Sequence, residues 1–425
     1  MRDAIGRALL FPALHQARAQ MRRHPEPQTL RRMAARADAM GRLPPDLRTE
    51  AVMAGSAPAT WFQLKGVRRE RVVLYLHGGA FVVETPRFHG ALLARICREA
   101  CARGLMVNYR LAPEHQYPAA LDDCMAAYRW LLEQGHEPGR ILVAGDSAGG
   151  NLTLALLLRL RDEGLPLPAG AVALSPVTDL SFSGDSIRRN DGIDDMFSAD
   201  TVASVTPAYL AQPERCREPL VSPHFGDFSG LPPLLLLVGS TELLLDDSVR
   251  LAQRWPGAEL LVWHGMPHVF PGFDFLPEAR AATARIGRFM RDCAPVKAEE
   301  EAAAETAAPP VNAGAAPAPG RVAAPPPATS IEAWLYGTLA FVTGWLSLAL
   351  LALWPGPLAL LTNPWVWAAT AVAVTFMVME AASVGVARLA GCLVAALGLG
   401  PGFGLALFLF LRARRRDRLK PLPPD

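Results

Sequence analysis

Hydrophobic and polar positions follow two different periods along the first 294 residues. Short apolar runs such as 141–145 and 234–238 are typical of buried strands, and longer stretches with helical spacing follow them. This alternation predicts an α/β fold, with a mainly parallel, doubly wound sheet covered by helices on both faces. The expected strands are 71–81, 105–111, 140–147, 170–176, 232–240 and 258–265, and the expected helices are 94–104, 121–135, 148–164, 246–255 and 277–292.

Two segments break this rhythm. Residues 1–60 and about 180–225 contain short, helical or loop-like pieces without a clear strand–helix order. We expect both to form a helical lid over a catalytic domain that spans residues 61–294.

The composition changes after residue 294. Residues 295–330 are rich in Ala, Pro and Glu and are predicted to be a disordered, semi-extended linker, because such a stretch cannot bury a core. Residues 331–412 are predicted to form an all-α transmembrane domain with a basic tail at 413–425. Its three apolar segments are each long enough to cross about 30 Å of hydrocarbon at 334–354, 364–386 and 389–411.

The sequence gives conflicting indications of the side of the membrane on which the globular part lies. The arginine-rich tail favours the cytoplasm, and three spans would then place the globular part outside. However, the amino terminus lacks the pattern of a signal peptide, and the five cysteines before the linker are an odd number that argues against a disulfide framework. We expect a multi-pass membrane protein whose globular part is cytoplasmic. Either one apolar segment then forms a re-entrant hairpin, or the basic tail does not follow the positive-inside tendency.

Charge excludes one class of partner. The formal net charge is only +2, so no overall field favours nucleic acid. The cysteines have no spacing typical of metal ligands, and we expect no metal and no organic cofactor.

A nucleophilic serine is predicted at residue 147. The stretch "GDSAGG" (145–150) joins a predicted strand directly to a predicted helix, and a G-x-S-x-G sequence in that context is typical of a strained turn that exposes its serine. The beginning of the helix also directs backbone N–H groups and a positive dipole toward developing negative charge.

An oxyanion hole is predicted from the stretch "HGGAF" (77–81). Glycines at this position leave backbone N–H groups free to point at a ligand, and we expect Gly78, Gly79 and Ala148 to supply the donors. We interpret His77 as a structural residue that braces this loop.

The general base is sought among the histidines after the serine, which are His224, His264 and His268. Where the catalytic residues occur along the chain in the order serine, acid, histidine, the histidine lies on the loop after the last strand. His268 lies well into the loop that follows 258–263. We therefore predict His268 as the base.

The acid is expected after the preceding strand. Glu242 comes directly after that strand, whereas Asp246 and Asp247 are typical N-cap residues of the following helix. We predict Glu242 as the acid that orients the histidine, with Asp246 as the alternative.

Five motifs occur in one order: "HGGAF", "YRLAPEHQYPAAL", "GDSAGGN", "SPVTDL" and "HVF". Over residues 40–294 the chain thereby resembles the hormone-sensitive-lipase-like esterases of the α/β-hydrolase fold. This resemblance implies a lid, Ser147 as nucleophile and His268 as base. The chain departs from the family pattern at Ala80, which replaces a third glycine, and at Glu242, which replaces an aspartate. The carboxyl-terminal part resembles small three-helix membrane domains of unknown function.

Together these features predict a membrane-tethered serine carboxylesterase or lipase-like hydrolase. Its partners are expected to be a small ester or lipid-like substrate and a lipid bilayer. The alternative is a non-catalytic binding or scaffold protein that keeps the fold without turnover.

Overall fold

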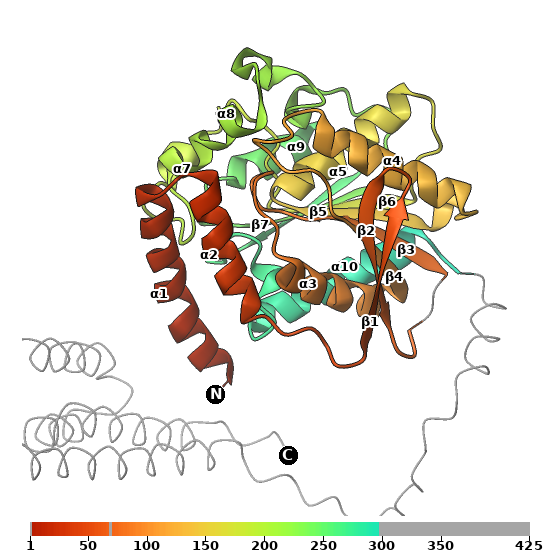
Figure 1. Cartoon of the computed structure of the whole chain (residues 1–425), viewed down its shortest axis with the longest axis horizontal. Helices are drawn as coiled ribbons and strands as arrows, with labels where there is room; N and C mark the ends of the chain where they lie inside the picture. Colours follow the sequence, from red (N-terminus) through yellow and green to blue (C-terminus); the bar gives the residue numbers. More distant parts are fainter. Residues whose placement is uncertain (1, 68–69, 297–425) are drawn as a thin grey trace, which may run out of the picture. The chain divides into compact units, whose positions relative to one another are not determined.

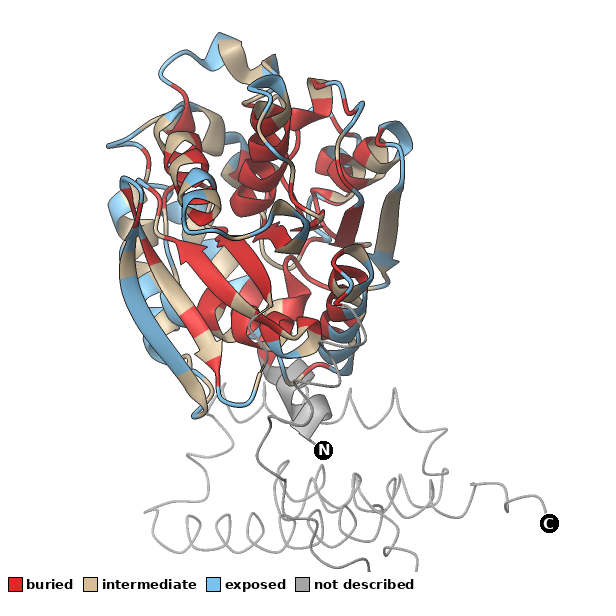
Figure 2. Ribbon diagram, turned by 90° about the vertical axis from the view of Figure 1, so that its right-hand side faces the viewer, coloured by how far each residue is buried: buried red, intermediate tan, exposed pale blue. Residues whose placement is uncertain are grey.

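The central strands are completely buried because helices cover both faces of the sheet (Figures 1 and 2). The computed structural model describes residues 2–67 and 70–296. It has an eight-stranded sheet with the strand order β1-β2-β4-β3-β5-β6-β7-β8. The prediction of a mainly parallel α/β sheet is confirmed. The predicted membrane spans and basic tail, and the linker from residue 297 onward, lie outside the described residues.

Six neighbouring strands of the sheet are parallel, and the first two form an antiparallel hairpin at one edge. The parallel strands are β3 (Arg71–Leu76), β4 (Ala102–Val107), β5 (Ile141–Asp146), β6 (Gly170–Leu174), β7 (Leu234–Gly239) and β8 (Ala258–Trp263). Since parallel strands end at the same edge of a sheet, the loops after β3, β5, β7 and β8 meet there.

The hairpin of β1 (Leu47–Ala54) and β2 (Ala57–Leu64) corrects the last part of the prediction that residues 1–60 form a helical lid, since only the part before residue 40 is helical. β1 pairs with β2 from Leu47 opposite Leu64 to Ala54 opposite Ala57, so this segment belongs to the sheet. Most of β1 is exposed, including the consecutive Arg48, Thr49 and Glu50. An exposed edge strand does not need the alternating apolar pattern by which strands are found in a sequence.

The side chains of β3 show how the two helical layers are formed. Leu74 packs with α4 and α5 on one face, whereas Val73 and Tyr75 pack with α3 and α10 on the other. Figure 1 shows these two layers on opposite sides of the sheet. Their helices are α3 (Pro86–Ala100), α4 (Ala119–Glu133), α5 (Ala148–Asp162), α9 (Leu245–Arg254) and α10 (Pro277–Cys293).

The amino-terminal helices lie beside the segment inserted after β6, as Figure 1 shows. His15 on α1 (Arg2–Arg23) contacts Asp195 at 2.8 Å, and Arg18 donates to Asp191 at 3.1 Å. The inserted segment contains short helices, as expected. They are α6 (Ser186–Arg189), α7 (Ala199–Ala203), α8 (Val205–Tyr209) and the 3-10 turns η2 (Pro213–Arg217) and η3 (Pro223–Phe225).

The second helix, α2 (Pro27–Ala39), is attached to the loop that follows β3. Asp38 accepts hydrogen bonds from the backbone N–H groups of Arg87 and Phe88. These donors lie in the first turn of α3, where the helix itself offers them no acceptor. Arg31 donates to the carbonyl oxygen of Val82 at 2.8 Å.

Within residues 2–67 and 70–296, no helix is both long and apolar enough to span a bilayer.

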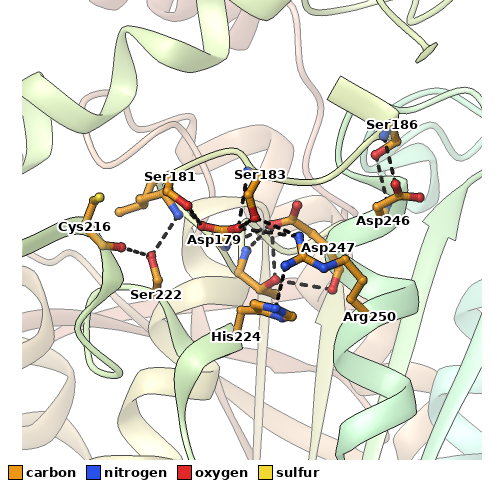
Figure 3. Close-up of polar contacts among 12 residues, drawn as sticks. Asp179, Ser181, Ser183, Ser186, Cys216, Ser222, His224, Asp246, Asp247 and Arg250 are labelled. Carbon is orange, nitrogen blue, oxygen red and sulfur yellow. Dashed lines mark hydrogen bonds and ion pairs between the residues drawn. The ribbon is translucent and has the colours of Figure 1, made fainter. Parts of the chain in front are cut away.

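A buried polar network ties the inserted segment to α9 (Figure 3). Asp247 accepts hydrogen bonds from the backbone of Thr178 and Asp179 and is fully buried. Arg250 contacts Asp179 at 3.5 Å and His224 at 2.7 Å. Burial raises the pKa of Asp247 to about 7, and the charge of Asp179 adds to this effect, although hydrogen bonds from the backbone of Thr178 and Asp179 oppose it.

This raised pKa predicts a stability that falls with pH. The folded protein keeps the Asp247 proton to about pH 7, whereas the unfolded chain loses it near the ordinary value of 3.8. The stabilisation that the protonated carboxyl provides is thus complete below about pH 4 and declines as pH rises to about 7. Asp247→Asn cannot ionise and keeps an acceptor oxygen. We expect its melting temperature, relative to wild type, to rise with pH across this window in calorimetry.

The control for this comparison is Asp185→Asn, because Asp185 is exposed on the inserted segment. Its difference from wild type is expected to stay constant with pH. An equally constant difference for Asp247→Asn contradicts the prediction.

Candidate active site

The turn between β5 and α5 holds Ser147 in a strained backbone conformation. Its φ is 53° and its ψ is −118°, which few residues other than glycine adopt. Glycines on both sides make this turn possible, because a Cβ at Gly149 would collide with the carbonyl oxygen of Leu76, and one at Gly145 with that of Gly149. The predicted strand–serine–helix turn is therefore present, with Ser147 at its tip.

The loop after β3 corrects one predicted oxyanion donor. The N–H of Gly78 donates to Asp146 Oδ1 at 3.0 Å, so the choice of Gly78 as a free donor is wrong. The N–H groups of Gly79 and Ala80 donate to no other described residue. Gly79 has a φ of 118°, a conformation that requires glycine.

Asp146 is the centre of a buried cluster beneath this loop. Besides Gly78 it accepts a hydrogen bond from the Tyr75 hydroxyl at 2.7 Å and contacts His89 Nε2 at 3.2 Å. Burial opposes ionisation, but the charge of His89 and hydrogen bonds from His89 and Tyr75 outweigh it and lower the pKa of Asp146. The sequence gives little signal for this cluster, apart from a tyrosine within an otherwise aliphatic strand.

His77 lies in the same loop and has the structural environment that we expected. Its Nδ1 donates to the carbonyl oxygen of Gly78 at 2.7 Å, and its ring stacks on Tyr109 with 4.2 Å between ring centroids. Burial lowers the pKa of His77 to about 4, so the ring is neutral at pH 7.

Glu242 and His268 form a buried pair on the loops after β7 and β8. His268 Nδ1 donates to Glu242 Oε2 at 2.7 Å, and the two residues are only 3% and 1% exposed, respectively. Burial alone would lower the pKa of His268, but the hydrogen bond and charge of Glu242 raise it above the usual 6.5. His268 Nε2 is buried and has no hydrogen-bond partner among the described residues.

Ser147 is attached to the same edge of the sheet through its backbone. Its N–H donates to the carbonyl oxygen of Leu174 at 2.8 Å, and its own carbonyl oxygen accepts from Val177 at 3.2 Å. Ser175, between these two residues, contacts Glu242 at 2.8 Å. The structure thus brings Ser147, Glu242 and His268 to neighbouring loops.

The alternative acid is directed elsewhere. Asp246 accepts a hydrogen bond from the Ser186 N–H at 2.8 Å and pairs with Arg189 at 3.0 Å, as part of the contacts of the inserted segment (Figure 3). Asp246 and Asp247 lie in the first turn of α9, whose N-cap is Leu244, so the N-cap prediction is wrong.

The other two histidines also lie away from the acid. His264 is exposed after β8, and His224 contacts Arg250 in the buried network.

The inserted segment contacts the acid and the histidine directly, which the sequence did not predict. Asn190 donates to the carbonyl oxygen of Glu242 at 2.7 Å, and Asp194 accepts from the N–H of Leu243 at 2.8 Å. The ring of Phe197 packs edge-on against His268 with 4.9 Å between centroids. The segment therefore helps to shape the site as well as to cover it.

The described residues hold no group of three or more His, Cys, Asp or Glu side chains arranged for a metal ion. The cysteines in this part of the chain are all free thiols: Cys97, Cys101, Cys124, Cys216 and Cys293. The geometry thus contains a strained serine, a carboxylate–imidazole pair and free backbone donors.

Comparison with known proteins agrees with this geometry. The profile of the α/β-hydrolase fold matches residues 73–272. An acetyl-hydrolase of Streptomyces hygroscopicus is 41% identical over 248 residues, which cover 57% of this chain and 82% of the relative. The chain belongs to the hormone-sensitive-lipase-like esterases of the α/β-hydrolase fold. An esterase of Acinetobacter venetianus is 37% identical over 53% of this chain and 80% of its own length.

Solved structures support the same assignment for this esterase. A crystal structure of an esterase from the bacterial hormone-sensitive lipase family is 43% identical, with a TM-score of 0.60, and the match covers 62% of this chain and 90% of that one. An esterase/lipase from an uncultured bacterium is 37% identical, with a TM-score of 0.59, over 63% of this chain and 92% of that one. The matched part of the esterase thus corresponds to nearly the whole of these enzymes.

Proposed function

We propose that this esterase hydrolyses carboxylic esters with Ser147 as nucleophile, His268 as general base and acid, and Glu242 as the residue that orients His268. The observation that carries the proposal is the buried 2.7 Å contact between Glu242 and His268 at the edge of the sheet where the strained turn holds Ser147. The N–H groups of Gly79 and Ala80, and that of Ala148 at the first position of α5, are proposed to hold the oxyanion. A donor of this kind contributes roughly 3–4 kcal/mol to transition-state stabilisation.

The proposed reaction has two halves. His268 Nε2 takes the proton of the Ser147 hydroxyl as its oxygen attacks the ester carbonyl, and the same proton then goes to the leaving alcohol. Water next attacks the acyl-serine while His268 removes its proton, and the acid product leaves with Ser147 restored. The carboxylate of Glu242 stabilises the imidazolium that forms in each half.

Small acyl groups are the substrate class that we propose. Two relatives are named an acetyl-hydrolase and an ethyl acetate hydrolase, the second from Pseudomonas putida and 34% identical. The ring of Phe197 packs edge-on against His268, and we expect it to limit the room for a long acyl chain beside the base. No observation favours the non-catalytic alternative, since the serine, the histidine and free backbone donors are all present.

The first test replaces the nucleophile. Ser147→Ala is expected to reduce hydrolysis of p-nitrophenyl acetate by at least about 10⁴-fold in kcat, because the residual catalysis comes only from binding and the oxyanion donors. Ser229→Ala, on an exposed loop, is the matched control and should retain full activity. Wild-type rates for Ser147→Ala would exclude the mechanism.

The second test separates the two candidate acids. Glu242→Gln is expected to lower kcat about 10²-fold or more, because an amide cannot stabilise the imidazolium. Asp246→Asn should stay within about threefold of wild type, since among the described residues the Asp246 side chain is hydrogen-bonded to the inserted segment alone. A larger loss for Asp246→Asn than for Glu242→Gln would assign the acid to Asp246 instead.

The pH dependence of wild-type kcat/KM should report the same base. Because only neutral His268 accepts a proton, activity is expected to rise with pH through a pKa above 6.5.

We also propose that the esterase is tethered to a membrane with its catalytic part in the cytoplasm. The tether is supported by three apolar segments of the sequence, at 334–354, 364–386 and 389–411, of which the second contains one charged residue, Glu380. The cytoplasmic side is supported by the free thiols of the described residues. It agrees with a cytoplasmic basic tail if one of the three segments does not cross the membrane.

The third test concerns this tether. The full chain is expected to sediment with membranes and to stay there in alkaline carbonate, whereas a chain ending at residue 296 should remain in the supernatant with its esterase activity. In inverted vesicles, protease should reach the catalytic part without detergent. Recovery of the full chain in the supernatant would refute the tether, and protection in inverted vesicles would refute the cytoplasmic side.

A further inference from the structure

The loop that follows β6 contacts all three residues of the proposed triad or their immediate neighbours. At its beginning Leu174 accepts a hydrogen bond from the N–H of Ser147, and at its end Val177 donates to the Ser147 carbonyl oxygen. Between them lies Ser175, whose side chain faces the other two loops. A single short segment therefore connects the loops that carry Ser147, Glu242 and His268.

The hydroxyl of Ser175 makes two hydrogen bonds across this junction. It donates to Glu242 Oε1 at 2.8 Å and accepts from the backbone N–H of Val269 at 3.2 Å. Val269 directly follows His268 in the sequence. One buried hydroxyl thus joins the carboxylate of the acid to the backbone beside the base.

The backbone of Ser175 is itself firmly held. Its N–H donates to the carbonyl oxygen of Leu237 on β7 at 2.7 Å, its φ is 45°, and only 1% of the residue is exposed. A left-handed conformation in a buried serine persists only where the surrounding contacts fix it. The direction of the hydroxyl is therefore determined by the sheet.

The two oxygens of Glu242 have separate partners. Oε1 accepts from Ser175 and from the backbone N–H of Gly239, and Oε2 accepts from His268. Donors on Oε1 hold the carboxylate in the plane that presents Oε2 to the imidazole. These donors also disperse part of the negative charge of the Glu242 carboxylate, which would otherwise act on His268 alone.

We propose that Ser175 is a positioning residue that sets both the orientation of Glu242 and the pKa of His268. This inference rests on the proposed function and adds a residue to it. Ser175 does not contact the substrate in this role and acts only through its neighbours.

The expected consequence of losing the hydroxyl has a definite sign. Without Ser175 Oγ, the charge of Glu242 is less dispersed and the imidazolium is favoured more strongly, so the pKa of His268 rises. The acid limb of kcat/KM then moves to higher pH. The carboxylate and the His268 loop also lose a shared contact, which lowers kcat at every pH.

The test compares Ser175→Ala with Ser248→Ala. Ser248 is also fully buried, but its hydroxyl has no hydrogen-bond partner among the described residues, so it controls for loss of a buried serine. For Ser175→Ala we expect kcat on p-nitrophenyl acetate to fall about 10-fold or more, which is the scale of one hydrogen bond to a charged group. KM should change little, and the acid limb should shift upward. Ser248→Ala should keep the wild-type pH profile.

A second arm asks whether Ser175 acts through Glu242. In the Glu242→Gln background, Ser175→Ala should cause less than about a threefold further loss, because coupled residues are not additive. An unchanged kcat and pH profile in Ser175→Ala, or full additivity with Glu242→Gln, overturns the inference.

Two controls keep the outcomes separate. If Ser175→Ala does not fold, Ser175→Cys keeps the volume with a weaker donor, and wild-type kcat and pH profile in that variant overturn the inference equally. The proposed function fails instead if Ser147→Ala remains active. The two failures are therefore distinguishable in one series of variants.

Discussion

The turn at Ser147 depends on backbones that approach one another more closely than any side chain permits. The first turn of α5 lies against the carbonyl oxygen of Leu76 at the end of β3, and this contact leaves no room for a Cβ at Gly149. The strain at Ser147 can persist because β3, β5 and α5 are anchored in the buried core. The sheet therefore does more than carry the serine, since its packing holds the serine in a conformation that the isolated segment would not keep.

The other members of the site depend on contacts between loops. Glu242 and His268 follow neighbouring strands, which brings them close, but strand order alone does not fix their hydrogen bond. Asn190 and Asp194 hold the backbone around Glu242 from the inserted segment. Asp195 and Asp191, in the same segment, are in turn bonded to His15 and Arg18 of α1. The amino-terminal helices, which lie far from the serine in sequence, thus belong to the support of the acid.

The sequence was informative where the fold imposes a local pattern. Buried strands, glycines beside a serine and the order of serine, acid and histidine are visible along the chain, and from them Ser147, Glu242 and His268 could be chosen. The hairpin β1–β2 was missed because β1 is largely exposed and carries polar residues. Gly78 was misjudged because its partner, Asp146, lies 68 residues away. Contacts such as those of Ser175 connect distant loops, and a serine before a proline looks like any turn until those loops are placed.

The position of Asp146 has a consequence for how this enzyme can change shape. Asp146 directly precedes Ser147, and its buried carboxylate holds the Gly78 N–H, the Tyr75 hydroxyl and His89. The turn that carries Ser147 is consequently joined by a hydrogen bond to the loop after β3. The inserted segment makes none of these hydrogen bonds. Substitutions in the inserted segment can therefore change its contacts with Glu242 and His268 without removing the hydrogen bond that joins the serine turn to the loop after β3.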